Sequence, residues 1–326
     1  MTEKLKVALI GCGRMGYSWD KTTNKNQLIA HSHFSAIMKS QEFELVAVAE
    51  KNIQTREEIT SNHGIRAFSD YKEMLLSLND LHLVVLATPD ETHYDILMNL
   101  VPFKPKCVFV EKPLAMNSNG CSEVANEYRE SGIHLFINFS RRFLPEFKTL
   151  KKEILSADFG IPLSLTIHYS GSILHNGIHF LDLAHWYFGK PVECSITGMS
   201  VFVPGKGHGN EPNSLQLIYE DGFKINLIGL GMDAPTHHDL DFIGNKGRFR
   251  VTTTGKIIKY GLKEFLEFPD FHFFDETERS IVNYALSLPN AYDEISQSVT
   301  NGEPPERQSE VCAELSSWIE NAAKNL

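Results

Sequence analysis

The chain has 326 residues, of which 42% are hydrophobic and 22% charged, and its formal net charge is −10. A chain of this length forms about two compact domains, and the composition is that of a folded globular protein and not of a disordered one. The negative charge argues against nucleic acid as a partner, and no apolar run is long enough to cross a bilayer.

The N-terminus enters an apolar strand directly, without the features of an export signal. The five cysteines show no paired spacing, which fits a reducing compartment better than a disulfide framework. We therefore expect a cytoplasmic protein.

Up to about residue 140, short apolar runs alternate with amphipathic stretches. This alternation predicts an α/β fold whose N-terminal domain, residues 1–140, is a doubly wound parallel sheet of the Rossmann type. Expected helices include Ile53–His63 and Tyr94–Leu100. The expected strands are Val7–Ile10, Glu44–Ala49, Leu83–Ala87, Cys107–Val110 and His134–Asn138.

A glycine-rich segment follows the first expected strand. Its G-x-G-x-x-G order lets a backbone turn tightly and approach a pyrophosphate at a helix N-terminus. The alternative is a glycine-rich turn that binds no ligand. The residues predicted to contact the cofactor here are Gly11, Cys12, Gly13, Arg14, Met15 and Gly16.

An acidic residue, Glu50, ends the second strand, where a carboxylate would hold the ribose hydroxyls of NAD and oppose the 2′-phosphate of NADP. It lies 34 residues after Gly16, further than a simple unit requires. The excess is a polar insertion at residues 17–32, ahead of a helix that begins with the sequence HFSAIM. We expect NAD as the cofactor, although Lys51 beside Glu50 leaves NADP as an alternative.

After Arg142 the pattern changes to a helix at Leu144–Leu155 and then to extended segments. Those segments are Leu163–Tyr169, Ser195–Val203 and Leu215–Ile228, and the last has a hairpin signal at Asp221-Gly222. The chain ends on an amphipathic helix. We therefore expect residues 141–326 to form an α+β domain with a mostly antiparallel, open sheet.

Six segments, in order, carry a resemblance to a known family. They are GCGRMG, ATPDETH, EKPL, NFSRRFLPEF, GIHFLDLAHWYFG and FIGNKGRFRV. With them the chain resembles the Gfo/Idh/MocA oxidoreductases over nearly its whole length, and EKP with H-x-x-D is more specific than the glycine loop. The resemblance implies hydride transfer between NAD and a secondary hydroxyl or keto group of a sugar, inositol or nucleotide sugar.

The resemblance also implies the catalytic groups. Lys112 of EKP would lie beside the reacting carbon and His179 would act as acid/base, while Asp182 would contact substrate or orient His179. An imidazole that titrates near neutrality suits removal of a hydroxyl proton, and a lysine can stabilise the developing alkoxide. Glu111 could position the lysine.

Further residues are predicted around these. His175 stands where similar proteins often have an aspartate, and we expect it to contact substrate and share in catalysis. Arg142 is expected either to contact substrate, as Lys112 and His179 are, or to form a salt bridge across the domain boundary. The remaining predicted cofactor contacts are Thr88, Pro89, His93, Glu111 and Lys112.

The sequence leaves alternatives to a metal-free dehydrogenase. His175, His179 and Asp182 could share one helical face and supply three metal ligands, but Lys112 is expected in the same space with a positive charge, so we predict no metal. A catalytically inactive, cofactor-binding sensor of the same fold would not need both Lys112 and His179. The substrate and the direction of the reaction stay open, and the resemblance implies a homodimer or homotetramer.

Overall fold

The computed structural model describes residues 3–23, 30–199, 212–306 and 308–324. The chain divides into two compact units. The N-terminal unit comprises Met1–Phe143 and Ala285–Ser316, and the second unit comprises Leu144–Tyr284 and Ser317–Leu326. Packing thus joins two separate stretches of chain in the N-terminal unit, whereas the expected domains, 1–140 and 141–326, are consecutive.

The N-terminal unit is built on a six-stranded sheet in the order β3-β2-β1-β4-β5-β6, with every neighbouring pair parallel. The order reverses between β1 and β4, and at such a point a doubly wound sheet binds its ligands beyond the carboxyl ends of the strands. The predicted Rossmann fold is confirmed. The strands are β1 Leu5–Ile10, β2 Phe43–Ala49, β3 Arg66–Phe68, β4 Leu83–Leu86, β5 Cys107–Val110 and β6 His134–Ile137.

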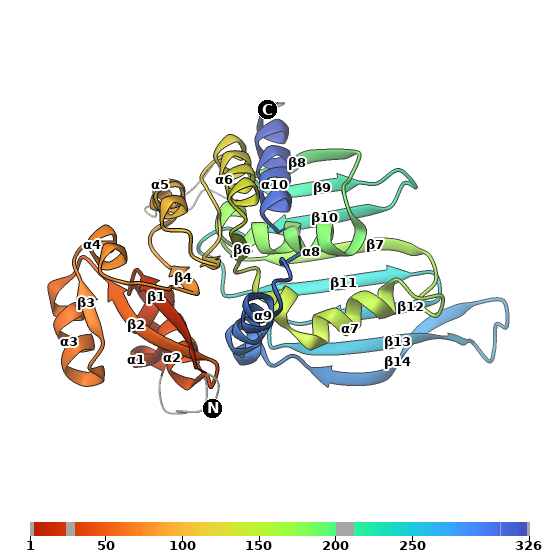
Figure 1. Ribbon diagram of the computed structural model, residues 1–326. Coiled ribbons are helices and arrows are strands. Elements are labelled where there is room, and N and C mark those ends of the chain that lie inside the picture. Colours follow the sequence, from red (N-terminus) through yellow and green to blue (C-terminus); the bar gives the residue numbers. More distant parts are fainter. Residues whose placement is uncertain (1–2, 24–29, 200–211, 307, 325–326) are drawn as a thin grey trace. The chain divides into compact units, whose positions relative to one another are not determined.

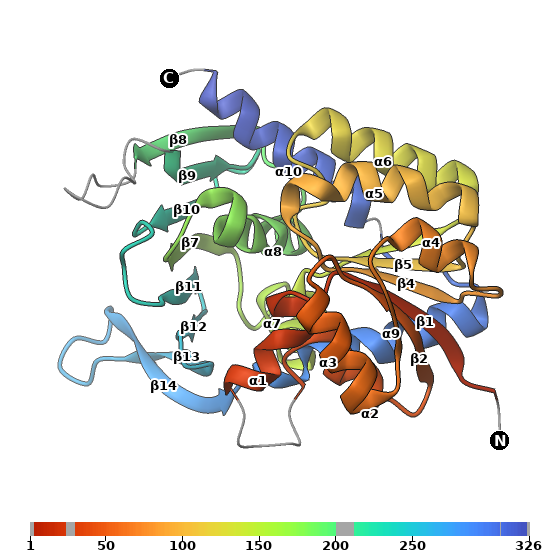
Figure 2. The same ribbon diagram turned by 90° about the vertical axis from the view of Figure 1, so that its left-hand side faces the viewer.

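Helices lie on both faces of this sheet, with α5 and α6 on one side and α2 and α9 on the other (Figure 2). Their ends follow from local chemistry. The Asn52 side chain accepts a hydrogen bond from the Thr55 amide and starts α3, and Gly64 ends it in a left-handed conformation. The helical segments are η1 Arg14–Ser18, α1 Trp19–Thr23, α2 His33–Lys39, α3 Ile53–His63, α4 Tyr71–Leu76, η2 Asp90–Thr92, α5 His93–Leu100, η3 Val101–Phe103, α6 Ser118–Ser131, η4 Ser140–Phe143 and α9 Ser287–Asn301.

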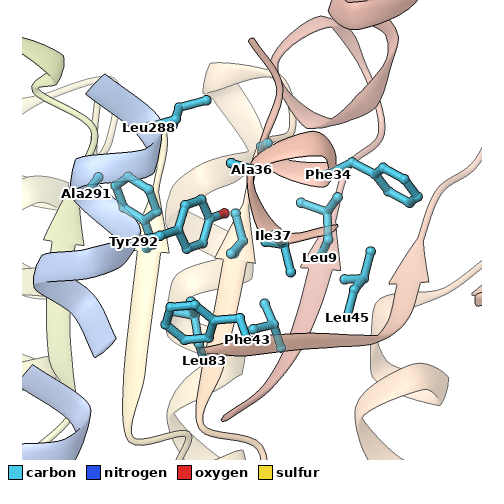
Figure 3. Packing of buried hydrophobic residues seen from close by; sticks show 14 of the residues in the cluster. Leu9, Phe34, Ala36, Ile37, Phe43, Leu45, Leu83, Leu288, Ala291 and Tyr292 are labelled. Carbon is cyan, nitrogen blue, oxygen red and sulfur yellow. The ribbon is translucent and has the colours of Figure 1, made fainter. Parts of the chain in front are cut away.

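The apolar core on one side of the sheet explains why a late stretch of chain belongs to the N-terminal unit. Figure 3 shows Leu288, Ala291 and Tyr292 of α9 beside α2 and the strands β1 and β2. All three are buried in one cluster with Ile37 and Phe43. Because a large apolar side chain contributes about 1.5–3 kcal/mol on full burial, the inner face of α9 holds it against the sheet.

The second unit is an eight-stranded sheet in the order β14-β13-β12-β11-β7-β10-β9-β8. Only β7 and β10 pair in parallel among these neighbours, so the mostly antiparallel sheet is confirmed. The strands are β7 Pro162–Tyr169, β8 Glu193–Met199, β9 Pro212–Ile218, β10 Lys224–Gly229, β11 His238–Gly244, β12 Gly247–Val251, β13 Lys256–Glu264 and β14 His272–Ile281.

Two helices, α7 Pro145–Ile154 and α8 Ile178–Phe188, lie across one face of this sheet (Figure 1). Tyr187 of α8 links the layers, because its ring stacks on Phe242 of β11 and its hydroxyl donates to the Phe147 carbonyl of α7 at 2.7 Å. A short helix, η6 Tyr284–Leu286, and the terminal helix α10 Gln308–Ala323 complete the elements. Among the described residues, no helix has the length and apolar character needed to span a membrane.

The hairpin predicted around Asp221-Gly222 is present as β9 and β10. Gly222 adopts φ +82°, and the Asp221 carboxylate accepts from the Phe223 amide at 3.0 Å, which is why this turn needs these two residues. The segment expected at Ser195–Val203 matches β8 up to Met199, and its last residues lie outside the described part of the chain.

Candidate functional site

The glycine loop after β1 is packed where it must be and open where a ligand could approach. Gly11 has φ +90°, and a Cβ there would lie 2.5 Å from the Ala87 carbonyl oxygen at the end of β4. A Cβ on Gly16 would lie 2.1 Å from the Gly11 carbonyl oxygen, but at Gly13 nothing lies within 4 Å. Gly11 and Gly16 are therefore needed to fold the loop, and Gly13 leaves room for phosphates to approach the backbone.

The carboxylate of Glu50 is fixed beside this loop. One of its oxygens accepts from the Cys12 amide and the other from the Asn52 amide, each at 2.8 Å. Arg56 donates to the Glu50 and Lys51 carbonyl oxygens at 2.7 Å. An acid held at the end of β2, against a glycine loop, fits the ribose side of a dinucleotide. Cys12 contributes its amide, while burial raises the pKa of its thiol.

The insertion leaves this geometry intact because it is closed at its base. The Asp20 carboxylate accepts from the amides of His31 and Ser32 at 2.9 Å and also from the Ser32 hydroxyl. In the loop itself, the Arg14 guanidinium lies 4.4 Å from the centre of the Trp19 ring, and Met15 is half-buried. Residues 24–29 lie outside the described part of the chain.

Three predicted cofactor contacts follow β4. Thr88 and Pro89 lead into η2, and the Thr92 hydroxyl lies 2.7 Å from both the Thr88 hydroxyl and the Pro89 carbonyl oxygen. His93 is fully buried, with Nδ1 2.7 Å from the Pro113 carbonyl oxygen and Nε2 3.0 Å from that of Thr88. Its ring therefore fastens the end of β4 to the loop after β5, and both ring nitrogens face backbone carbonyls.

Glu111 and Lys112 directly follow β5 and are both buried, each with 8% exposure. The Asn138 amide donates to Glu111 Oε1 at 2.8 Å, and His33 Nε2 lies 3.0 Å from the same oxygen. His33 Nδ1 lies 2.9 Å from the Tyr292 hydroxyl. Glu111 is predicted to contact the cofactor; its Oε1 atom makes these contacts inside the N-terminal unit, and the contact with cofactor stays a prediction.

Sequence reasoning assigned no role to His33, Asn138 or Tyr292. A signal for His33 was present: it is a polar residue at the start of the apolar sequence HFSAIM, on the face of α2 that turns inward. Tyr292 had no such signal, because nothing local in α9 shows that it returns to the N-terminal unit.

Glu111 and Lys112 carry charges of opposite sign, and both side chains are buried. Burial lowers the pKa of Lys112, and the negative charges of Glu111 and Asp90 offset this only in part. Burial acts to raise the pKa of Glu111, but the contacts of His33 and Asn138 and the charge of Lys112 outweigh it, so the pKa is lowered. The glutamate is therefore ionised, and the lysine gives up its proton more easily than an exposed lysine.

The histidine-containing segment belongs to the second unit, whereas Lys112 belongs to the N-terminal unit. His175 is exposed in η5 Ile173–Gly177, His179 is half-buried at the start of α8, and Asp182 is 1% exposed one turn further on. Gly177 permits this entry to the helix, because a Cβ there would lie 2.8 Å from the Tyr169 hydroxyl. Among the described residues, no three His, Cys, Asp or Glu side chains are grouped as metal ligands.

Arg142, predicted to contact substrate or to form a salt bridge, lies in η4 and is 5% exposed. Its Nη1 atom is 3.0 Å from Glu306 Oε2, and both residues belong to the N-terminal unit. The ion pair is thus present within one unit, and the contact with substrate stays a prediction.

Comparison with known proteins also points to a dinucleotide-binding oxidoreductase. Residues 5–139 match the family model GFO_IDH_MocA, described as an oxidoreductase family with an NAD-binding Rossmann fold. The chain is 22% identical over 272 residues to the scyllo-inositol 2-dehydrogenase (NAD(+)) of Bacillus subtilis strain 168, an alignment that covers 78% of this chain and 75% of that protein.

Two solved structures share the fold along the whole chain. The WlbA dehydrogenase from Bordetella pertussis, in complex with NADH and UDP-GlcNAcA, has a TM-score of 0.75 at 18% identity, covering 100% of this chain and 97% of that one. A mutant 3-ketoreductase from Actinomadura kijaniata, in complex with TDP-benzene and NADP, has a TM-score of 0.76 at 16% identity, covering 99% and 98%. With its Rossmann sheet, its glycine loop and these relatives, the chain is an NAD(P)-binding oxidoreductase whose residues 5–139 match the Gfo/Idh/MocA family.

Proposed function

We propose that the protein is a dehydrogenase that transfers a hydride between NAD and a secondary hydroxyl or keto group of a sugar, an inositol or a nucleotide sugar. The observation that carries this proposal is the buried pair Glu111 and Lys112 at the carboxyl end of β5. This strand belongs to the same sheet as β1, which the glycine loop follows. A lysine is costly to bury, and this one has a lowered pKa. Such a residue at a ligand-binding sheet edge is a candidate for chemistry.

The choice of substrate class rests on the relatives. The Bacillus subtilis protein is named as an inositol dehydrogenase, and the Bordetella pertussis structure contains a nucleotide sugar. These molecules share a ring with secondary hydroxyl groups, so a site for one class suits the chemistry of the others.

For the cofactor we propose NAD in preference to NADP, because the Glu50 carboxylate suits two ribose hydroxyls and repels a phosphate. The nicotinamide, when bound, supplies the acceptor or donor of the hydride. The residues that would hold the dinucleotide are Gly11, Cys12, Gly13, Arg14, Met15, Gly16, Glu50, Thr88, Pro89, His93, Glu111 and Lys112.

The protein's own groups would handle charge and protons. Lys112 would stabilise the negative charge that develops on the substrate oxygen, and His179 would take up or return the hydroxyl proton. Asp182 would orient His179 or bind substrate, and His175 and Arg142 would contact the substrate. We assign no metal to this site.

Lys112→Ala and His179→Ala test these roles. Both variants should fold and still bind NAD(H), while turnover falls about 10²- to 10⁴-fold, the usual effect of removing a positioned acid/base group. Matched controls are Lys72→Ala and His272→Ala, because both residues are exposed and both variants should keep full turnover. The assay follows NADH formation with a panel of inositols, hexoses and nucleotide sugars. Normal turnover by Lys112→Ala would remove the lysine from the mechanism, and tight NAD(H) binding without turnover of any substrate would favour the sensor.

We also propose that the domain expected at residues 1–140, together with the stretch Ala285–Ser316 that packs into it, binds the dinucleotide. The rest of the domain expected at residues 141–326 would bind substrate and form a homodimer or homotetramer. We assign substrate binding and assembly to the sheet of the second unit, whose side chains include polar pairs such as Gln216 with Asn226 and Arg248 with Asp241. Light scattering of the purified protein measures the oligomeric state.

A further inference from the structure

We propose that His33 is a positioning residue, which holds Glu111 ionised and in place and thereby maintains the positive charge of Lys112. The inference deepens the proposed function and rests on it, since the charge of Lys112 matters for turnover only if Lys112 takes part in the chemistry. His33 itself would touch neither substrate nor cofactor.

The geometry around His33 is that of a fixed, buried contact. The residue has no exposed surface, and the edge of Phe109 packs against its ring with centroids 5.1 Å apart. Its two nitrogens reach in different directions, Nε2 to Glu111 at 3.0 Å and Nδ1 to the Tyr292 hydroxyl at 2.9 Å. Figure 3 shows Tyr292 extending from α9 toward α2, the helix that begins with His33.

The partners determine where the ring carries its proton. An ionised carboxylate can only accept hydrogen bonds, so His33 must donate from Nε2 to Glu111. The buried Tyr292 keeps its proton, because burial raises the pKa of its hydroxyl. Tyr292 can therefore donate to a bare Nδ1 when the ring is neutral, or accept from it when the ring is charged. In both states His33 offers Glu111 the same N–H group.

Titratable groups from several elements among the described residues face the pair. His33 of α2, Tyr292 of α9 and Lys112 face Glu111, and Glu111 and Asp90 of η2 face Lys112. Burial already lowers the pKa of Lys112, and Glu111 is the larger of the two influences that oppose it. If Glu111 loses its charge or its position, the larger of these opposing influences is lost, so the lysine loses its proton at a lower pH. An uncharged amine cannot stabilise a developing alkoxide.

The test measures the Lys112 titration directly and needs no substrate. In protein labelled with ¹⁵N and ¹³C at lysine, the Lys112 signal is assigned by its absence in Lys112→Met and followed over pH by NMR. Glu111→Gln should lower the Lys112 midpoint by about one unit, as expected when a neighbouring opposite charge is removed. His33→Leu should lower it in the same direction, while His33→Gln, which retains an N–H donor, should stay closer to the wild type.

Two variants serve as controls. Glu123→Gln removes an exposed carboxylate that bonds Tyr94, and His134→Leu removes a half-buried histidine that bonds Ser298. Both should leave the Lys112 midpoint unchanged. If Glu111→Gln or His33→Leu also leaves it unchanged, the inference is wrong.

A measurement on the wild-type protein covers the case in which His33→Leu does not fold. In protein labelled with ¹⁵N at histidine, the His33 signals, assigned with His33→Gln, should show a proton on Nε2. A ring that carries its proton on Nδ1 alone would overturn the proposal. Turnover by Lys112→Ala tests the proposed function separately, because normal turnover would contradict the role of Lys112 while leaving the charge coupling measurable.

Discussion

At the scale of single residues, Lys112 and Glu111 show how the same burial acts in opposite directions. Glu111 has neutral and cationic partners that favour its charged form, so its pKa is lowered despite burial. The carboxylates of Glu111 and Asp90 favour the charged form of Lys112, but the effect of burial is larger, so the pKa of Lys112 is lowered as well. An apolar side chain at position 112 would make the fold more stable than Lys112 does, because a buried charge costs free energy even when it is paired.

This leads to a prediction on stability. Since the pKa of Lys112 is lower in the folded than in the unfolded chain, its proton destabilises the fold. That penalty is complete below the folded-state pKa and disappears as the pH rises past the ordinary lysine value of 10.5. Lys112→Met keeps the aliphatic stem, so its free energy of unfolding at pH 7 should equal or exceed that of the wild type, and the difference should shrink toward pH 10.5. Urea denaturation at several pH values measures this.

The exposed Lys72→Met variant is the matched control, and its free energy of unfolding should change by less than about 0.5 kcal/mol. If Lys112→Met instead loses more than about 2 kcal/mol at pH 7, the lysine stabilises the fold and its burial needs no catalytic explanation.

At the scale of elements, the glycine loop offers a sharper experiment because its glycines are not equivalent. Gly11→Ala would introduce a Cβ at φ +90° and 2.5 Å from a carbonyl oxygen, which should cost about 1–3 kcal/mol of stability. Gly13→Ala meets nothing within 4 Å and should stay within about 0.5 kcal/mol of the wild type. Gly13→Ala should nevertheless bind NAD(H) at least about tenfold more weakly, a loss of roughly 1.4 kcal/mol, because its methyl group fills the space left for phosphates.

Thermal unfolding and calorimetric titration of the two variants separate folding from binding. Unchanged NAD(H) affinity in Gly13→Ala would show that the phosphates do not approach the loop at this residue.

Elements with strong local signals were predictable from the sequence. The helix Ile53–His63 has its asparagine and glycine caps, and the hairpin has its Asp221-Gly222 turn. The strand β3 was missed because three residues, none of them fully buried, give no hydrophobic pattern of strand length.

The candidate site shows the same limit of local patterns. The loop, Glu50 and Lys112 stand in recognisable motifs, but the contact between His33 and Tyr292 joins residues 259 positions apart and has no local pattern.

At the scale of the whole molecule, the return of Ala285–Ser316 to the N-terminal unit could not be read from the sequence. The apolar face of α9 predicts a buried helix, but hydrophobic burial is not directional and does not say which sheet covers that face. The packing of Tyr292 against Phe43 and Phe109 decides it. As a consequence, one residue of this late helix supports the histidine that bonds Glu111.

The division into two units leads to a last prediction, on how cofactor changes unfolding. Glycine loop and Glu50 both belong to the N-terminal unit, so NAD(H) should raise the temperature at which this unit unfolds. A ligand at 100 times its Kd stabilises the folded state by about 2.7 kcal/mol, which corresponds to a shift of roughly 5–10 °C in unfolding temperature for a unit of 150–250 residues.

NADP(H) at the same concentration should give a smaller shift in unfolding temperature, because its 2′-phosphate would be repelled by the anchored Glu50 carboxylate. Scanning calorimetry measures both shifts. In Glu50→Gln the shifts in unfolding temperature caused by NAD(H) and NADP(H) should become more similar. In Gly13→Ala both of these shifts should become small. A larger shift with NADP(H) in the wild type would mean that Lys51 or the insertion at residues 17–32, and not Glu50, determines the choice of cofactor.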